Sequence, residues 1–134
     1  MPPNNEGIVL GVDLGTTLSA TAAHGADGRP QIVSNPDGES LTPSVISLRD
    51  ENHPVVGRAA ANQFSLAPEF TVSCFKRFMG LTDSAGQPLP VFVHATSGRS
   101  YSAIDLSAIL LKYLAQGVEA SLGLPVKGVV ITVP

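Results

Sequence analysis

The 134-residue chain has little charge, no tryptophan and only one cysteine. Charged residues make up 14% of the sequence, and 8 Lys and Arg stand against 11 Asp and Glu, which gives a net charge of −3 at pH 7. Because proteins that bind nucleic-acid backbones concentrate Lys and Arg, this balance argues against a nucleic-acid surface. The lone Cys74 cannot form a disulfide within the chain, and this favours a reducing compartment.

Long apolar segments are missing as well. Residues 1–6 have neither the basic nor the apolar region of a signal peptide, and no apolar run approaches the roughly 18 residues of a membrane-spanning helix. We therefore expect a cytoplasmic protein that binds no membrane, with residues 1–6 as a disordered tail. Because 43% of the residues are apolar and so few are charged, we also expect exposed apolar surface that promotes self-association.

The first part of the chain predicts three short strands joined by tight turns. Residues 7–12 form a near-continuous apolar run, which predicts a strand buried on both faces. Residues 17–24 and 30–35 predict the next two strands, so that the three form a β-meander. The middle of the chain predicts shorter elements: paired strands at 44–48 and 55–56, a short helix at 57–64, and a hairpin over 91–101. The pattern of residues 70–78 is ambiguous, with a helix as one interpretation.

Residues 102–122 give the clearest helical pattern. Ser102 followed by Asp105 predicts a capping box, and Gly123 predicts the end of the helix. One apolar face is expected to contain Leu106, Ile109, Leu110, Tyr113, Leu114, Gly117 and Val118.

An apolar strand at 128–133 follows this helix. A helix that leads into a buried-type strand predicts a parallel strand beside the first one. The fold class is therefore α/β, with a mixed sheet, a β-meander at its start and one long crossover helix. Because such strands expect further layers on the sheet, we interpret the chain as one incomplete lobe of a larger domain.

The strongest chemical signal is the run Gly11–Thr17, which reads Gly-Val-Asp-Leu-Gly-Thr-Thr. Asp13 ends an apolar strand, where an ionised carboxylate needs compensation that Mg²⁺ could supply. Gly15 permits close approach of a ligand, and the N–H groups and hydroxyls of Thr16 and Thr17 suit a phosphate. Two simpler interpretations stay open: Asp13 could satisfy N–H groups of the turn, and the threonines could belong to an ordinary hairpin.

Other reactive side chains carry weaker signals. Lys76 and Arg77 lie between aromatic residues, and one of them could reach a phosphate, although two surface cations are the favoured interpretation. Cys74 is predicted to be a buried, inert thiol. Three histidines lack metal-ligand spacing and are predicted to be solvated turn residues: His24, His53 and His94.

An ordered set of short motifs resembles a known family. The run Gly11–Thr17 resembles the first phosphate loop of the seventy-kilodalton heat-shock chaperones (DnaK type). Further matching segments follow in the same order with similar spacing: Leu41–Ser44, Val56–Ala60 with Asn62 and Gln63, Phe75–Gly80, and Val130–Pro134. The resemblance covers nearly the whole chain after Glu6.

This resemblance implies an actin-like ATPase fold, which is also described as ribonuclease H-like. The chain would be an incomplete lobe I of that ATPase domain over residues 7–134, truncated at its C-terminus. An actin-like core would comprise 7–43 and 101–134, and a smaller inserted subdomain would comprise 44–100.

The resemblance also implies roles for the loop residues. Asp13 would hold Mg²⁺ through water. Gly15, Thr16, Thr17 and the backbone of Leu18 would cradle the β- and γ-phosphates of ATP or ADP.

Two cations and a proline would complete the implied site. Lys76 would position the attacking water and stabilise charge at the γ-phosphate, so that Lys76, Asp13 and Thr16 form the catalytic set. Arg77 would be a neighbouring nucleotide-binding residue, and K⁺ is a further candidate ion. Pro134 matches a hinge proline that links the nucleotide state to a substrate-binding domain.

For the protein that contains this lobe, the resemblance implies a stress-response chaperone that couples ATP hydrolysis to protein folding. Its partners would be unfolded peptides, J-domain proteins and nucleotide-exchange factors. The short spacing between Gly80 and Tyr101 resembles the HscC-like branch, and Leu18 replaces the usual Tyr or Asn.

The lobe alone is expected to be inactive, because a second phosphate loop and an adenosine pocket are absent from the sequence. Two alternatives remain. The chain could be a non-catalytic folded or interaction module, or a lobe of an actin-like small-molecule kinase. The kinase alternative gives no reason for the segment Phe75–Phe78.

Overall fold

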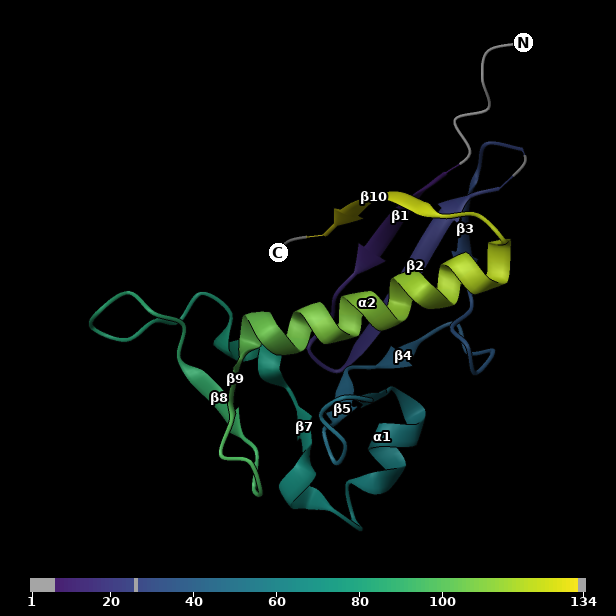
Figure 1. The fold of residues 1–134 in the computed structure, drawn as a ribbon. Coiled ribbons are helices and arrows are strands. Elements are labelled where there is room, and N and C mark those ends of the chain that lie inside the picture. The colour runs from purple at the N-terminus through teal and green to yellow at the C-terminus, as the bar shows by residue number, and fades with distance from the viewer. Residues whose placement is uncertain (1–6, 26, 133–134) are drawn as a thin grey trace.

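The computed structural model describes residues 7–25 and 27–132. The expected disordered tail at 1–6 and the hinge proline Pro134 lie outside the described residues. The fold combines a mixed sheet, a long helix and two smaller sheets (Figure 1). Among the described residues, no helix is long and apolar enough to cross a membrane.

The main sheet has the mixed topology that the sequence predicts. Strands β1 (Ile8–Asp13), β2 (Leu18–His24) and β3 (Pro30–Val33) form an antiparallel meander, and β10 (Val126–Ile131) pairs with β1 in parallel. The strand order is β10-β1-β2-β3, and the two-residue strand β4 (Thr42–Pro43) pairs with the start of β2. β10 begins two residues earlier than predicted, and β3 ends two residues earlier.

Only one face of the main sheet is covered. Leu10 and Val12 of β1 are almost fully buried, whereas Val9 between them is 52% exposed. The prediction that β1 is buried on both faces is therefore wrong for the described structure. Burial alternates along β1, but the apolar run in the sequence does not reveal this, because aliphatic side chains lie on both the covered and the open face.

The long helix α2 (Ala103–Leu122) covers that face. Its predicted capping box is confirmed: the Asp105 N–H donates to Ser102 Oγ (3.2 Å), and the Ser102 N–H donates to Asp105 Oδ2 (2.8 Å). Gly123 ends the helix with a φ of 69°, which glycine adopts without strain. The buried residues are largely the predicted stripe: Ala103, Leu106, Ser107, Leu110, Leu114, Gly117 and Val118.

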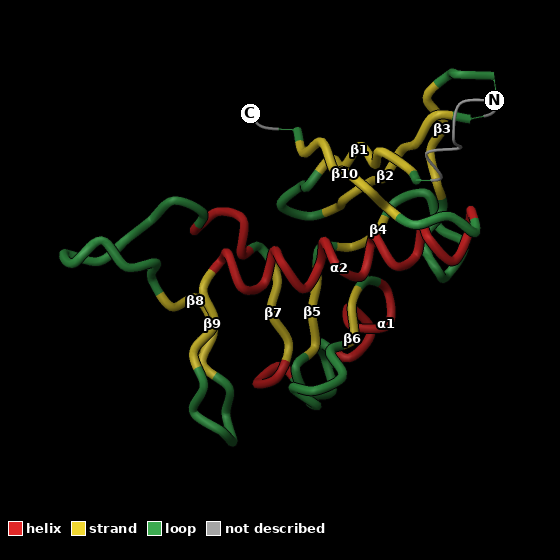
Figure 2. Tube along the Cα trace, turned by 45° about the horizontal axis from the view of Figure 1, so that its top comes forward, coloured by secondary structure: helices red, strands yellow, loops and turns green. Residues whose placement is uncertain are grey.

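The middle of the chain forms two smaller sheets. Strands β5 (Val45–Ser47), β6 (Val55–Val56) and β7 (Thr71–Ser73) pair in the order β6-β5-β7, and helix α1 (Arg58–Gln63) packs on β5. Strands β8 (Pro90–Val93) and β9 (Ser100–Ser102) form the predicted hairpin. In both ribbon views α2 runs between the meander strands and the strands β5 and β7 (Figures 1 and 2).

The segment 70–78, whose sequence pattern is ambiguous, does not form an α-helix. It consists of the end of the short 3-10 helix η1 (Pro68–Phe70), strand β7 and a second 3-10 helix, η2 (Phe75–Phe78). Pairing of β7 with β5 decides this outcome, because residues 71–73 take their place in the sheet opposite Ser47, Ile46 and Val45.

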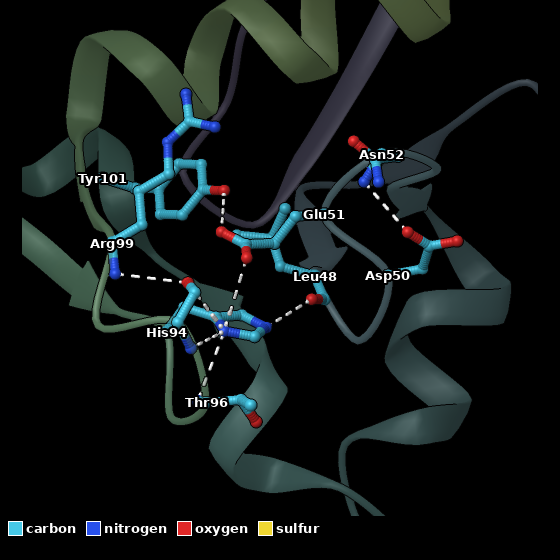
Figure 3. Close-up of polar contacts among 9 residues, drawn as sticks. Leu48, Asp50, Glu51, Asn52, His94, Thr96, Arg99 and Tyr101 are labelled. Atoms are coloured by element: carbon cyan, nitrogen blue, oxygen red, sulfur yellow. Dashed lines mark hydrogen bonds and ion pairs between the residues drawn. The ribbon is translucent and has the colours of Figure 1, made fainter.

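His94 connects the two small sheets (Figure 3). Its side chain is 5% exposed, so its predicted solvation is wrong, whereas His24 and His53 are exposed. Its Nδ1 accepts from the N–H groups of Thr96 (3.3 Å) and Ser97 (3.1 Å), and its Nε2 lies 2.9 Å from the carbonyl of Leu48. These contacts assign the hydrogen to Nε2, which donates to Leu48.

The loop between β3 and β4 is held by Asn35, which is buried. Its Oδ1 accepts from the N–H groups of Asp37 and Glu39, both at 2.9 Å. Asp37 in turn accepts from the hydroxyl of Tyr113 on α2 (3.3 Å). Burial and the nearby Asp37 carboxylate raise the pKa of Tyr113 to about 12.

Candidate functional site

The predicted phosphate turn lies at the carboxyl end of β1. Residues 14–17 connect β1 to β2 so tightly that a Cβ added to Gly15 would lie 1.9 Å from the carbonyl oxygen of Leu18. No side chain fits at this position without movement of the backbone, so the turn requires glycine.

Asp13 is the last residue of β1, and its side chain is exposed. The idea that a buried carboxylate here needs compensation is therefore wrong for the described structure. The Thr132 hydroxyl donates to Asp13 Oδ1 (3.1 Å), and the Thr132 N–H donates to the carbonyl of Val12 (3.0 Å). One carboxylate oxygen is thus oriented by a neighbour, and the carboxylate remains accessible.

Thr132 is a site residue that our reading of the sequence did not select. The signal for it was present, because the predicted parallel pairing of the first and last strands continues from Val12–Ile131 to Asp13 and Thr132. A hydroxyl at that position reaches the carboxylate directly.

The threonines that follow Gly15 have unused hydrogen-bonding groups. Thr16 is half-buried, and Thr17 is exposed. In the described part of the chain, no hydrogen bond engages the N–H or the hydroxyl of either threonine. Leu18 starts β2 opposite Pro43, and its side chain is 42% exposed. Free donors grouped in one turn are the feature that anion-binding loops share.

Lys76 is brought to this turn from 62 residues away. It lies in η2 and donates through Nζ to the carbonyl of Leu14. The neighbouring residue Phe75 is 1% exposed, and its burial in the core holds η2 in place. Lys76 is half-buried, so the interpretation as a plain surface cation does not hold for it.

Arg77 behaves differently from its neighbour. Its side chain is exposed, and it makes no hydrogen bond or ion pair with the described residues. Lys76 thus contacts the turn through a hydrogen bond, and Arg77 makes no such contact with the described residues. Cys74, which precedes η2, is half-buried rather than fully buried as expected.

The site fits a hydrated Mg²⁺ ion better than a fully protein-bound metal. Within residues 7–25 and 27–132, no three His, Cys, Asp or Glu side chains gather into a metal cage. Mg²⁺ commonly keeps several waters and binds through one or two carboxylates together with substrate phosphates. A single accessible carboxylate beside free N–H donors and an ammonium group suits that arrangement.

Comparison with known sequences gives two matches that cover nearly the whole chain. A sequence model of the family described as "Hsp70 protein" matches residues 9–134. The chaperone protein DnaK of Thermotoga neapolitana is 36% identical over 126 residues, which are 94% of this chain and 20% of that protein. The chain thus spans about one fifth of the length of this curated relative. The mixed sheet and its long helix agree with an actin-like ATPase fold. The chain therefore belongs to the Hsp70 family.

Proposed function

We propose that the chain is the first lobe of a nucleotide-binding domain that hydrolyses ATP in a molecular chaperone. The observation that carries the proposal is the contact between Lys76 and the Leu14 carbonyl, because it places a cation against a turn with free N–H donors. Phosphoryl transfer depends mainly on positioning and on electrostatic stabilisation, and this arrangement supplies both.

The turn is the proposed phosphate cradle. The N–H groups of Thr16, Thr17 and Leu18 would bind the β- and γ-phosphates, and Gly15 would let them approach. Asp13 would hold Mg²⁺ through the water shell of the ion, and the hydrogen bond from Thr132 would orient the Asp13 carboxylate. When bound, Mg²⁺ neutralises phosphate charge.

Two cations differ in their proposed tasks. Lys76 would orient the attacking water and stabilise negative charge at the γ-phosphate, with Asp13 and Thr16 completing the catalytic set. Arg77 is exposed and would act as an auxiliary contact to the nucleotide, and K⁺ would be an additional ion.

The wider role follows from the family. We propose that the protein binds and releases unfolded peptides in step with ATP hydrolysis, in the cytoplasm, and responds to J-domain and nucleotide-exchange partners. Two further points stay predictions. One is the division into a core at 7–43 and 101–134 with an insert at 44–100. The other is the placement of the protein in the HscC-like branch.

The test is Lys76→Ala in the natural full-length protein that contains this chain. We expect single-turnover ATP hydrolysis to fall on the order of 10²-fold or more, as when one donor to transition-state charge is removed. Nucleotide affinity, measured by calorimetry, should change only a few-fold, because the backbone donors remain.

Lys112→Ala is the matched control, since Lys112 is an exposed lysine on α2 whose side chain makes no hydrogen bond or ion pair with the described residues. It should hydrolyse ATP at the unaltered rate. Unchanged hydrolysis by the Lys76→Ala protein would remove Lys76 from the mechanism.

A further inference from the structure

Two buried serine hydroxyls lie directly behind the phosphate turn. Ser19 is 1% exposed and Ser44 is 2% exposed, and they come from β2 and from the residue after β4. Ser19 Oγ accepts from the Gly15 N–H (3.2 Å), and Ser44 Oγ donates to the Gly15 carbonyl (2.9 Å). The two hydroxyls lie 2.9 Å apart. Both polar groups of Gly15 are therefore bound to this pair.

The direction of these hydrogen bonds follows from counting protons. A serine hydroxyl has one proton. Ser44 uses its proton on the Gly15 carbonyl, so in the contact between the hydroxyls Ser44 must accept and Ser19 must donate. The three bonds form a closed ring: Gly15 N–H to Ser19, Ser19 to Ser44, and Ser44 to the Gly15 carbonyl. Bonds that point the same way around a buried ring polarise and strengthen one another.

This ring fixes the direction of the N–H donors that follow. In a trans peptide the N–H points opposite to the preceding carbonyl, and the described residues contain no cis peptide. Because Ser44 holds the Gly15 carbonyl inward, the Thr16 N–H points away from the two serines.

Ser44 orients a second peptide group, the one between Thr17 and Leu18, through its own backbone N–H. The Ser44 N–H donates to the carbonyl of Thr17 (2.9 Å), so the Leu18 N–H also points away from Ser44. Ser44 thus controls two of the three proposed phosphate donors, once through its hydroxyl and once through its backbone.

We propose that Ser19 and Ser44 are positioning residues that hold the phosphate turn in its binding geometry before any nucleotide arrives. This inference rests on the proposed function. Neither serine needs to touch the nucleotide, because they act through the peptide planes of Gly15 and Thr17. A turn prepared in this way avoids the cost of ordering its donors when the phosphates bind.

The test compares ligands with and without the phosphates that the turn would bind. In the natural full-length protein, Ser44→Ala should weaken Mg-ADP binding about tenfold, as expected when a buried hydrogen bond of roughly 1.4 kcal/mol is lost. Adenosine carries no phosphate, so its affinity should not change. Calorimetric titration with both ligands separates a local effect on the turn from a general loss of structure, which would weaken both.

Three further variants sharpen this comparison. Ser19→Ala should behave as Ser44→Ala does, and Ser44→Thr, which keeps the hydroxyl, should restore Mg-ADP affinity. Ser107→Ala is the matched control, because Ser107 is also a buried serine and its hydroxyl has no partner among the described atoms. That variant should bind Mg-ADP as the unaltered protein does.

Amide hydrogen exchange in the absence of ligand reports the ring itself. The Gly15 amide should be protected in the unaltered protein and should exchange at least tenfold faster in Ser19→Ala, which removes its acceptor. Unchanged Gly15 protection, or equal Mg-ADP affinity of the Ser44→Ala and unaltered proteins, overturns the positioning role. If the unaltered protein binds adenosine and Mg-ADP equally well, the proposed phosphate turn itself is wrong, whatever the serines do.

Discussion

At the scale of single residues, Cys74 has the most unusual backbone. Its φ of 56° and ψ of 19° are left-handed, and within residues 7–25 and 27–132 it is the one non-glycine residue with positive φ. It stands between β7 and η2, so this conformation sets the direction in which the chain passes from β7 into η2, the helix that contains Lys76. Left-handed geometry costs most side chains on the order of 1–2 kcal/mol, and Asn tolerates it better than β-branched residues do.

This predicts opposite outcomes for two substitutions of similar size. Cys74→Val should lower the free energy of unfolding by about 1–2 kcal/mol, because a β-branched side chain disfavours positive φ. Cys74→Asn should stay within about 0.5 kcal/mol of the unaltered chain. Urea denaturation of the three proteins measures this. Equal stability of the Val and Asn variants would show that the conformation of residue 74 carries no strain.

Residue-scale reasoning from the sequence selected Asp13 and Lys76 as candidate site residues and missed the residues that they contact. Asp13 contacts Thr132 across 119 positions, and Lys76 contacts Leu14 across 62. Such contacts depend on strand register and on the path of η2, which a local pattern does not contain. Ser19 was not selected, and Ser44 was named only as part of the segment Leu41–Ser44, because the contact between the two serines depends on the pairing of β2 with β4.

At the scale of elements, α2 was predictable because its signals are local. Its capping residues, apolar stripe and terminal glycine all lie within one continuous segment. By contrast, β7 depends on pairing with β5, which is distant in the sequence, and its three residues lie in the segment 70–78, whose sequence pattern is ambiguous. Short strands that gain their stability from such pairing are the elements that composition predicts least well.

The capping box of α2 gives a prediction at this scale. Ser102→Ala removes the oxygen that accepts from the Asp105 N–H and should lower the free energy of unfolding by about 1 kcal/mol. Ser121→Ala is the control, because Ser121 is exposed in the last turn of the same helix and alanine favours helices there. Thermal unfolding followed by circular dichroism should show a lower Tm for the first variant alone.

The loop between β5 and β6 is fastened to β9 by a hydrogen bond that depends on pH. The Tyr101 hydroxyl donates to Glu51 Oε1 (2.6 Å), and this bond lowers the pKa of Glu51 below its usual 4.5 (Figure 3). Because the folded-state pKa is lowered, the stabilisation is fully present above pH 4.5. It is lost as the pH falls through the lowered value.

Tyr101→Phe therefore should destabilise the chain at pH 7, and the difference from the unaltered protein should shrink below pH 4.5. The variant also lacks the Tyr101 hydroxyl, but the pKa of Tyr101 is raised above its usual 10, so this group does not titrate in the acid range and the shrinking difference reports Glu51. Urea denaturation at a series of pH values measures it. A difference that stays constant down to acid unfolding would mean that the bond to Glu51 contributes nothing to stability.

At the scale of the whole molecule, the sequence was sufficient to predict the mixed sheet and its crossover helix. It was not sufficient to predict which face of the sheet is covered. The mixed sheet and the crossover helix follow from the order of strand and helix patterns. Burial on both faces does not follow, because an aliphatic side chain on an open face looks the same in sequence as one in the core. Val9 and Leu10 are neighbours of the same chemical type, yet one is 52% exposed and the other is buried.

The open face of the main sheet gathers apolar side chains in one row. Strand register aligns Ile32 with Ala22, Ala22 with Gly11, and Gly11 with Val130. Ile32 and Val130 are 60% and 61% exposed. A depression of about 530 Å³ lies along this row and is lined mostly by apolar residues, Val9 among them. Contiguous apolar surface of this kind marks a contact face, and β10 beside it is the edge strand of the described sheet.

We therefore predict that this 134-residue chain associates with a second copy through the open face. Light scattering should show a mass that rises with concentration, and Val130→Lys should shift it toward the monomer, because a lysine at this position would have to bury its charge. Val93→Lys is the matched control, since Val93 is equally exposed at 57% but lies in β8, away from this face. It should associate as the unaltered chain does. A monomer at every concentration, or equal effects of the two lysines, would show that the open face is not the site of association.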